Sequence, residues 1–259
     1  MNIKEITSST NPEIIAVTKL HSPKGRKARN LFIGEGKRTL QTFAQAGWKP
    51  KNIYATEQAY HEAVGIFDSQ STSFFDEKKI TLVSNDVMQK ISASKSPSGI
   101  VAIFAIPEEP SLVTLSAGIV LANITDPGNM GTLLRSAAAF GKKTVVIIEG
   151  CDPWSPKVVQ ASAGTIAHLN IFQISWDTLT ENKGDLNLIA LIVKDGKKPS
   201  ELALAKSLLI VGSEAHGIPQ EWLALCDHRM TLPMPGNAES LNAAIAGSIA
   251  LYIATVTNI

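Results

Sequence analysis

Residues 117–149 read AGIVLANITDPGNMGTLLRSAAAFGKKTVVIIE. Two continuous apolar segments, AGIVLANI and KTVVIIE, flank a segment in which apolar residues have helical spacing, NMGTLLRSAAAF. Strands that are apolar throughout, rather than at every second residue, are typical of a parallel sheet whose two faces are covered by helices. The stretch therefore predicts a strand–helix–strand unit of a parallel α/β domain.

The remainder of the C-terminal half continues this alternation. A helical segment, SPKVVQASAG, and three apolar segments, HLNIFQIS, LNLIALIV and SLLIVG, follow in order. A stretch with two prolines and two glutamates, AIPEEPSLVTLS at residues 105–116, precedes the unit and has the composition of a linker. We therefore expect one α/β domain over residues 113–259.

The N-terminal half predicts a second, smaller α/β domain over residues 1–107. Its strand-like segments NLFIGEG, KNIYAT, KITLVS and GIVAIFAI alternate with helical segments. The apolar content of 44% in 259 residues is sufficient for a substantial core in each domain.

The charges are distributed unevenly along the chain. Net charge is only +1, but residues 1–51 carry 10 Lys and Arg against 3 Asp and Glu. Four of these cations, Lys24, Arg26, Lys27 and Arg29, lie within HSPKGRKARN at residues 21–30. The segment suits contacts with phosphates, although the charge alone fits a solvated loop equally well.

Several classes of protein are disfavoured by what the sequence lacks. Cys151 and Cys226 form no CxxC pair and the five histidines are scattered, so neither a disulfide framework nor a zinc site is indicated. The first 14 residues have no continuous apolar core, and no run of about 18 uncharged apolar residues follows. We expect a soluble cytoplasmic protein without a metal ion.

Three loops that follow apolar strands carry the candidate functional residues. Ligands of parallel sheets bind where strands end. The first loop, NITDPGNMGTLLRSAAAFG, contains Asn129, which can cap the next helix, and Arg135 within that helix. The second, LLIVGSEAHGIP, contains Gly212 and Glu214. Each pattern taken alone fits an ordinary turn or cap as well as a site.

The third loop is LPMPGNAESLNAAIAGSIALY, residues 232–252. Its prolines and Gly236 predict an irregular backbone, and Ser240 and Asn242 are expected to begin a final helix of small residues. Neither a Rossmann glycine fingerprint nor a Walker loop occurs in the chain. The sequence therefore favours an adenosine moiety held by backbone groups over a phosphate-cradling loop.

The segments DPGNMGTLLRSAAAFG, IVGSEAHGIP and LPMPGNAESLNAAIAGSIALY together resemble the three motifs of the SpoU/TrmH family of RNA ribose 2′-O-methyltransferases, within the SPOUT superfamily. They occur in the family's order. SSTNPEIIAVTKL and IGEGKRTL are similar to the substrate-binding domain that many members carry, so the resemblance covers nearly the whole chain.

The resemblance implies a parallel α/β domain with a deep trefoil knot, a rare exception to the unknotted rule. It also implies S-adenosylmethionine as cofactor and a homodimer that completes the active site. The matching positions implied as cofactor-binding are Gly212, Leu232 and Leu241 through backbone groups, with Met234 and Gly236 shaping the loop.

The resemblance assigns a catalytic role to Arg135, which matches the motif-one arginine described as the base in the family. Because an arginine normally stays protonated in proteins, phosphate anchoring and stabilisation of the developing alkoxide are equally good roles. Asn129, Glu214, Ser240 and Asn242 match the other polar motif positions. The chain departs from many members at Gln160, where they carry a basic residue, and has His216 at a variable position.

RNA is the expected partner, and we expect its contacts to be shared between the basic N-terminal segment and the catalytic face of the dimer. The candidates are Lys24, Arg26, Lys27, Arg29, Lys37 and Arg38, with Glu35 and Gly36 of the GEG segment. 23S rRNA is the first substrate and tRNA the second. A non-catalytic RNA-binding protein of ribosome assembly and a nucleotide-dependent metabolic enzyme are the alternative classes; the four tryptophans are expected to be packing residues rather than a stacking platform.

Overall fold

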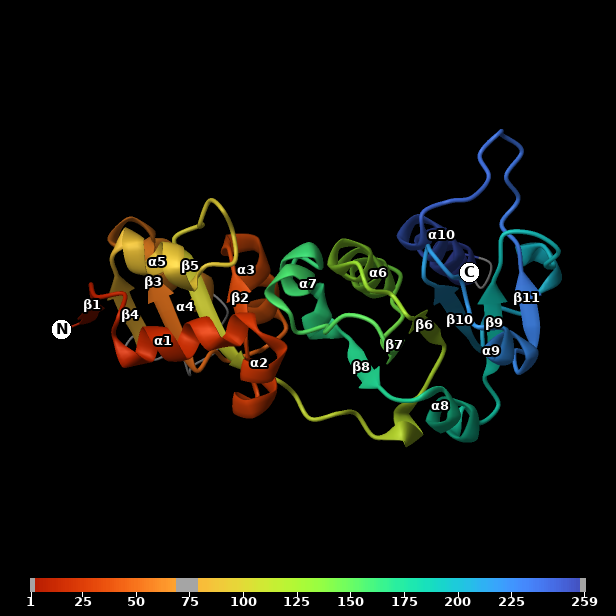
Figure 1. The fold of residues 1–259 in the computed structure, drawn as a ribbon, viewed down its shortest axis with the longest axis horizontal. Coiled ribbons are helices and arrows are strands. Elements are labelled where there is room, and N and C mark those ends of the chain that lie inside the picture. The colour runs from red at the N-terminus through yellow and green to blue at the C-terminus, as the bar shows by residue number, and fades with distance from the viewer. Residues whose placement is uncertain (1–2, 69–78, 257–259) are drawn as a thin grey trace. The chain divides into compact units, whose positions relative to one another are not determined.

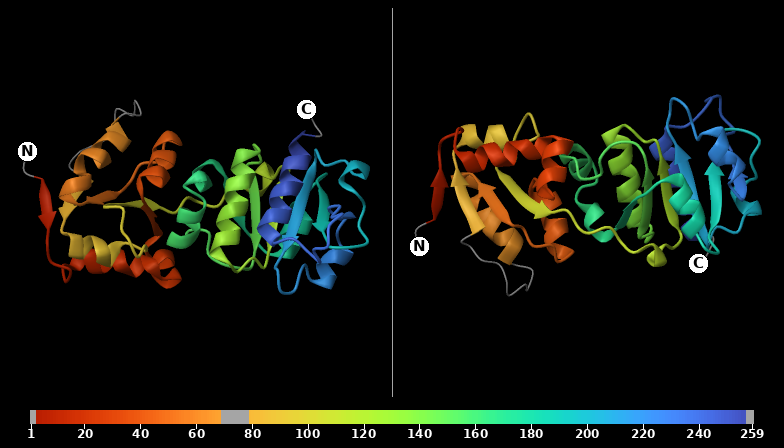
Figure 2. Two further views of the ribbon diagram at one scale, coloured as in Figure 1. Left: turned by 90° about the horizontal axis from the view of Figure 1, so that it is seen from above. Right: turned by 60° about the horizontal axis from the view of Figure 1, so that its bottom comes forward.

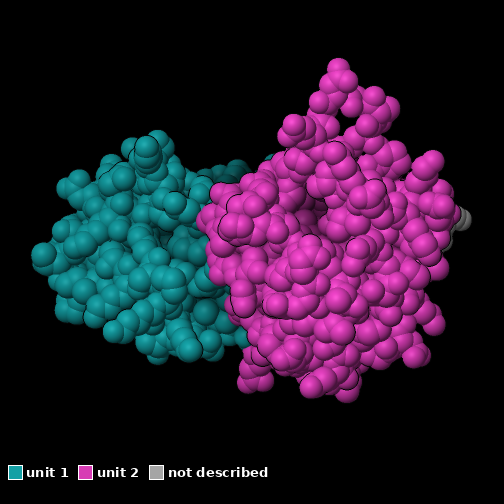
Figure 3. Space-filling view, turned by 45° about the vertical axis from the view of Figure 1, so that its right-hand side comes forward, with its two compact units in different colours: residues 1–107, 152–167 teal, residues 108–151, 168–259 magenta. Residues whose placement is uncertain are grey.

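A computed structural model describes residues 3–68 and 79–256. The chain forms two compact units, which Figure 3 shows in different colours. Unit 1 contains the chain up to residue 107 together with residues 152–167, and unit 2 contains residues 108–151 and those from 168 onward. The sequence analysis placed residues 152–167 in the second domain, whereas in the structure they pack into the first.

Unit 1 is a three-layer α/β/α sandwich around a mixed five-stranded sheet in the order β1-β4-β3-β5-β2 (Figure 1). The strands are β1 Lys4–Ile6, β2 Leu31–Glu35, β3 Asn52–Ala55, β4 Ile80–Val83 and β5 Ile100–Ala105. The helices are α1 Pro12–Thr18, α2 Pro23–Arg29, α3 Lys37–Gln45, α4 Tyr60–Asp68, α5 Asn85–Ile91 and α7 Pro156–Ala161. Strand β5 is antiparallel to both β2 and β3, which accounts for the mixed sheet.

An aromatic cluster explains why residues 152–167 belong to unit 1. Trp154 is buried, and its ring lies 5.0 Å from that of Phe32 on β2. Phe43 and Phe104 stack on each other in the same cluster. Trp48 packs among them and donates a hydrogen bond from Nε1 to the Ala167 carbonyl at 3.1 Å. Trp48 and Trp154 pack in this cluster, and Trp176 is buried in the core of unit 2. Three of the four tryptophans are thus packing residues, as predicted.

Helix α2 is fixed to unit 1 by an arginine that points inward. Arg26 is 2% exposed, and its guanidinium forms an ion pair with Asp152 at 2.6 Å. It also donates hydrogen bonds to the carbonyls of Leu20 and His21. The charge of Arg26 is therefore neutralised inside the protein, and its side chain cannot meet an RNA phosphate, contrary to the prediction made for it.

Unit 2 has a six-stranded, fully parallel sheet in the order β11-β9-β10-β6-β7-β8. The strands are β6 Gly118–Ala122, β7 Thr144–Ile148, β8 Asn170–Gln173, β9 Asn187–Leu191, β10 Ser207–Gly212 and β11 His228–Met230. The helices are α6 Pro127–Ala139, α8 Trp176–Asn182, α9 Gln220–Ala224 and α10 Ala243–Val256. Because helices cover both faces (Figure 2), the strands are apolar throughout, and the predicted parallel α/β architecture is confirmed.

The connections of unit 2 create a crevice at the carboxyl end of the sheet. From β6 the chain proceeds through α6 to β7 on one side, whereas from β10 it proceeds through α9 to β11 on the other. Since β6 and β10 are neighbours, the loops that follow them diverge, and such switch points are where α/β sheets bind ligands. After β11 the chain runs out as a long loop before it returns to α10 (Figure 1). The trefoil knot that the resemblance implies stays a prediction.

Helix α10 packs its small residues into this unit. Ala243, Ala244, Ala250 and Ala254 are buried, and a Cβ added at Gly247 would lie 2.5 Å from a methyl of Leu133 on α6. Ser248 and Ser136 also share a hydrogen bond of 2.7 Å between their hydroxyls. The small residues thus bring α10 close to α6 and β10 within one chain.

Two further expectations concern thiols and membranes. Burial raises the pKa of the Cys226 thiol to about 11, and that thiol donates a hydrogen bond to the Trp222 carbonyl, so it is a packing residue. Among the described helices, none is long and apolar enough to cross a lipid bilayer.

Candidate active site

The start of α6 places Asn129 where its side chain can act. Asp126, not Asn129, is the N-cap: its carboxylate accepts a hydrogen bond from the Asn129 backbone N–H at 2.7 Å, and Pro127 occupies the first helical position. The sequence analysis offered Asn129 as a possible cap. Because Asp126 satisfies the helix end, the Asn129 amide is free to donate a hydrogen bond to Glu214 at 2.8 Å.

Glu214 is presented by a turn that folds back over the end of β10. The Gly217 N–H donates to the Ser213 carbonyl at 2.8 Å, and Gly217 has a φ of +67°, which favours glycine. A Cβ on Gly212 would lie 2.3 Å from the Gly217 carbonyl carbon. Only glycine at position 212 therefore lets the turn close and direct Glu214 towards α6.

Asn242 connects the third motif to the other two. Its side-chain oxygen accepts hydrogen bonds from the backbone N–H groups of Ala244 and Ile245, at 2.9 and 3.2 Å. This cap fixes the amide orientation, so the side-chain nitrogen points outward and donates to Asn129 Oδ1 at 3.1 Å and to Glu214 Oε1. The helix end thereby determines the orientation of both partners.

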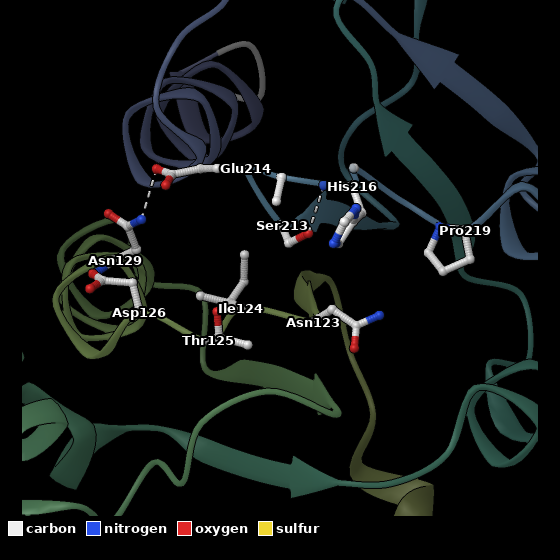
Figure 4. A pocket seen from close by; sticks show the side chains of 11 residues that line it. Asn123, Ile124, Thr125, Asp126, Asn129, Ser213, Glu214, His216 and Pro219 are labelled. Atoms are coloured by element: carbon white, nitrogen blue, oxygen red, sulfur yellow. Dashed lines mark hydrogen bonds between the residues drawn. The ribbon is translucent and has the colours of Figure 1, made fainter.

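Asn129, Glu214 and Asn242 form a closed triangle of hydrogen bonds, hereafter the amide–carboxylate triangle. Both bonds to the carboxylate end on Oε1, and Oε2 of Glu214 accepts none from the described part of the chain. Figure 4 shows the bond between Asn129 and Glu214 at one side of a cavity. A carboxylate held in this way has one oxygen in a fixed position for a ligand.

Two cavities meet at Glu214. One, of about 420 Å³, lies among the segments that follow β9, β10 and β11. The other, of about 660 Å³, lies in the crevice between the loops after β6 and β10. Ser213, Glu214 and Gly217 line both, so two molecules bound in the two cavities would meet at this turn.

The smaller cavity contains most of the residues that the resemblance implied for the cofactor. Gly212, Leu232, Met234 and Leu241 line it, together with Ser240. Gly236 does not line it and lies open to solvent at the outer part of the long loop. The sequence analysis missed Leu191, the last residue of β9, and Ile192 and Val193, which follow it; none of them carries a turn or polar signal.

The chemistry of the smaller cavity fits S-adenosylmethionine. Apolar side chains of Leu, Ile, Val and Met form its walls, and the approach of the chain at Gly212 exposes backbone groups that can bind an adenine edge. The carboxylate of Glu214 at the wall is complementary to the positive charge of a sulfonium. The residues present therefore suit a cationic nucleoside without a phosphate.

Arg135 stands apart from this cluster. It lies six residues after Asn129 on α6, about 1.7 helical turns further on, so the two side chains leave the helix on different faces. Its side chain is exposed and lines neither cavity. A single chain thus brings together Asn129, Glu214, Ser240 and Asn242 but not Arg135.

The residues predicted to contact RNA divide into buried and exposed sets. Glu35 is buried, and its carboxylate accepts hydrogen bonds from the Ser92 hydroxyl and the Ala93 N–H, at 2.5 and 3.0 Å. Like Arg26, it is a structural residue and cannot contact RNA in this conformation. The side chains exposed to solvent are Lys24, Lys27 and Arg29 on α2, and Lys37 and Arg38 at the start of α3.

The two exposed groups lie at opposite ends of β2. Helix α2 ends just before the strand, and α3 begins just after it at Lys37, so a five-residue strand of roughly 17 Å separates them. Lys37 is also paired with Glu62 at 2.6 Å. Among the described residues, the three exposed cations on α2 form no ion pair with an acidic side chain, so their charge is the more available of the two groups for contacts with phosphates.

Replacing Gly212 with alanine should weaken cofactor binding. The new methyl would force the turn at Gly217 away, at a cost of about 1–3 kcal/mol, and would displace Glu214 with it. We expect the Kd for S-adenosylmethionine, measured by isothermal titration calorimetry, to rise by about tenfold or more. Gly236→Ala is the matched control, since nothing lies within 4 Å of its added Cβ. Equal Kd values for the two variants would contradict the role given to Gly212.

Comparison with known proteins agrees with this geometry. The model of the SpoU rRNA Methylase family matches residues 116–252, and that of the MRM3-like substrate binding domain matches residues 11–102. A Synechocystis protein named as an uncharacterized tRNA/rRNA methyltransferase is 31% identical, over 97% of this chain and 93% of its own length. The 23S rRNA (guanosine(2553)-2′-O)-methyltransferase RlmP of Bacillus subtilis is 27% identical, covering 96% and 98%.

A solved structure shows the same fold with the cofactor. The AdoMet-bound rRNA methyltransferase from Sinorhizobium meliloti superposes with a TM-score of 0.84 at 24% identity, over 99% of each chain. AdoMet is S-adenosylmethionine, which suits the smaller cavity described above. The chain belongs to the SpoU rRNA methylase family and is an RNA ribose 2′-O-methyltransferase.

Proposed function

We propose that this enzyme methylates a ribose 2′-hydroxyl of ribosomal RNA, and of 23S rRNA in particular. The observation that carries the proposal is the amide–carboxylate triangle between two cavities, one suited to S-adenosylmethionine and one open for a nucleoside. The choice of 23S rRNA follows the Bacillus relative, which acts on that molecule. Transfer RNA is the alternative substrate.

The triangle suits the first requirement of the reaction, which is to position the hydroxyl. Methyl transfer needs the 2′-oxygen in line with the sulfonium methyl that the bound cofactor supplies. Oε2 of Glu214 lacks a partner in the described residues, and Glu214 lines both cavities, so this oxygen can accept a hydrogen bond from the 2′-hydroxyl. Asn129 and Asn242 hold that carboxylate in place.

Arg135 would provide positive charge from outside the cavities of its own chain. Its guanidinium can bind a backbone phosphate of the substrate in a bidentate manner or stabilise the oxyanion that forms as the proton leaves. Both roles require it to approach a bound RNA. An exposed position on α6 is compatible with that requirement.

The central experiment measures transfer of labelled methyl groups. Purified protein and methyl-labelled S-adenosylmethionine are incubated with rRNA or tRNA from a strain that lacks the gene, and the RNA is digested to nucleosides. We expect label in a 2′-O-methylnucleoside of rRNA. Arg135→Ala should lower kcat/KM by about 10²-fold, with Arg229→Ala, an exposed arginine outside both cavities, as control.

Each other result has a distinct meaning. Label in tRNA alone would establish the reaction but reject rRNA as substrate. Cofactor binding with no transfer to isolated rRNA, to tRNA or to ribosomal subunits from the same strain would reject the proposed reaction in favour of a non-catalytic RNA-binding protein.

We further propose that Lys24, Lys27 and Arg29 on α2 bind RNA phosphates, whereas Arg26 stabilises the fold. Lys27→Met should lower affinity for rRNA and reduce the slope of log K against log salt by about 1, with no loss of stability. Arg26→Met should leave Asp152 and two carbonyls without their partner and lower the free energy of unfolding by about 3 kcal/mol. Filter binding and urea denaturation measure the two effects. A reversal of the two phenotypes would contradict the assignment.

We also propose that the enzyme forms a homodimer through the outer face of α10. Ile245, Ile249, Tyr252 and Val256 follow one another at spacings of four, three and four residues, which places them on one helical face, and each is 38–52% exposed. Four large apolar residues in a row on a solvated helix form the kind of patch that marks an interface. The same association would bring a second α6, with its Arg135, into the assembly.

A charge in the middle of this row should dissociate the dimer. We expect wild-type protein to have twice the mass of one chain by multi-angle light scattering, and Ile249→Asp to have the mass of a single chain. Val113→Asp is the control, because Val113 is 91% exposed but stands outside the row. A monomeric wild type, or an Ile249→Asp variant that stays dimeric, would reject this interface.

A further inference from the structure

The larger cavity has room for more than a ribose. Its volume of about 660 Å³ lies well inside the range of small-molecule sites, about 300–1,000 Å³. One wall holds Asn129 and Glu214 of the amide–carboxylate triangle, next to the cofactor cavity. The opposite wall is formed by Asn123, His216 and Pro219, as Figure 4 shows. A ribose at the first wall would therefore place its base at the second.

We propose that Asn123 and His216 determine which base the enzyme accepts at the methylated nucleotide. The proposal rests on the function proposed above and adds to it the recognition of the acceptor base. Its physical basis is that both side chains line the cavity while neither the Asn123 amide nor the His216 ring forms a hydrogen bond with the described residues. Their donors and acceptors are therefore available to a ligand.

The backbone holds Asn123 in a defined position. It follows β6 directly with a φ of +58°, in the left-handed region that asparagine tolerates better than most residues. Its N–H donates to the Ile148 carbonyl at 3.0 Å, which ties it to the end of β7. An uncommon backbone conformation at a cavity wall marks a position where orientation of the side chain matters.

His216 is held at a fixed separation from Glu214. The two residues share the turn over Gly212, in which the His216 N–H donates to the Ser213 hydroxyl at 3.2 Å. One turn thus holds both Glu214, which is proposed to bind the ribose, and His216, which is proposed to bind the base. The sequence analysis noted His216 only as a variable position in the second motif.

The chemistry of the two side chains suits a nucleobase. An asparagine amide offers one acceptor and two donors, which can match the mixed edge of a base, and an imidazole can hydrogen-bond or stack on it. A polar site that pairs with a base edge rejects a base lacking the complementary group, because buried polar atoms are then left unpaired. The acceptor nucleotide must be unpaired to enter, so the site would read a flipped or single-stranded base.

The test uses transcripts of the RNA that takes up label, made with each of the four bases at the acceptor position. Wild-type enzyme should prefer one base by at least tenfold in kcat/KM. Asn123→Asp replaces the two N–H donors with a charged carboxylate oxygen and keeps a residue of the same shape that tolerates the left-handed backbone. His216→Ala removes the ring. We expect at least one of them to change the ratio between bases by tenfold or more, while the Kd for S-adenosylmethionine stays within twofold.

Asn30→Asp is the matched control, since Asn30 has a φ of +53° but lies in unit 1. Its base ratio should equal that of wild type. A wild-type enzyme that prefers one base, with both cavity variants keeping that ratio, would overturn the inference and leave the proposed function intact. Equal methylation of all four bases by wild type would overturn it as well. No transfer by wild type to any transcript would instead reject the proposed function, and the inference with it.

Discussion

The side-chain amide of Asn242 is the interaction on which the site depends. Its oxygen satisfies two N–H groups at the start of α10, and this leaves its nitrogen only one direction in which to point. That nitrogen meets Asn129 and Glu214, whose own amide and carboxylate can then adopt a single arrangement. The helix end is thus a reference point for residues that lie 28 and 113 positions away in sequence.

Close backbone packing is what allows the three motifs to reach one another. At Gly212 the turn of the second motif rests directly on the strand, and at Gly247 the last helix rests on α6 and β10. A Cβ at either position would lie 2.3 or 2.5 Å from a neighbouring atom, closer than van der Waals contact allows, so the packed elements would have to move apart. The amide–carboxylate triangle therefore depends on both glycines, since a displaced turn or helix would break hydrogen bonds that are only about 3 Å long.

The sequence predicted the helices and strands better than the contacts between residues that are distant in the chain. Apolar runs identified the parallel sheet of unit 2, because burial of both faces leaves a simple signature in each strand. No comparable pattern in the sequence shows that residues 152–167 pack into unit 1. Their contacts are with residues more than a hundred positions away: Trp154 packs against Phe32, and Asp152 binds Arg26. For the same reason the sequence gives the number of cations in HSPKGRKARN but does not show that one arginine is buried and the other three cations are exposed.

For the site, too, the sequence identified most of the residues but not their positions in the fold. Motif resemblance identified Asn129, Glu214, Ser240 and Asn242, and the structure assembles them. The loop sequence had offered Asn129 as a possible helix cap, whereas the N-cap is Asp126. The segment after β9 was missed because it contributes ordinary apolar side chains. Arg135 differs again, because the motif names it while the fold of one chain directs it outward. In the proposed dimer, burial of the exposed apolar row on α10 would also reduce the water around Arg135 on the neighbouring helix α6 and so strengthen its interaction with a phosphate.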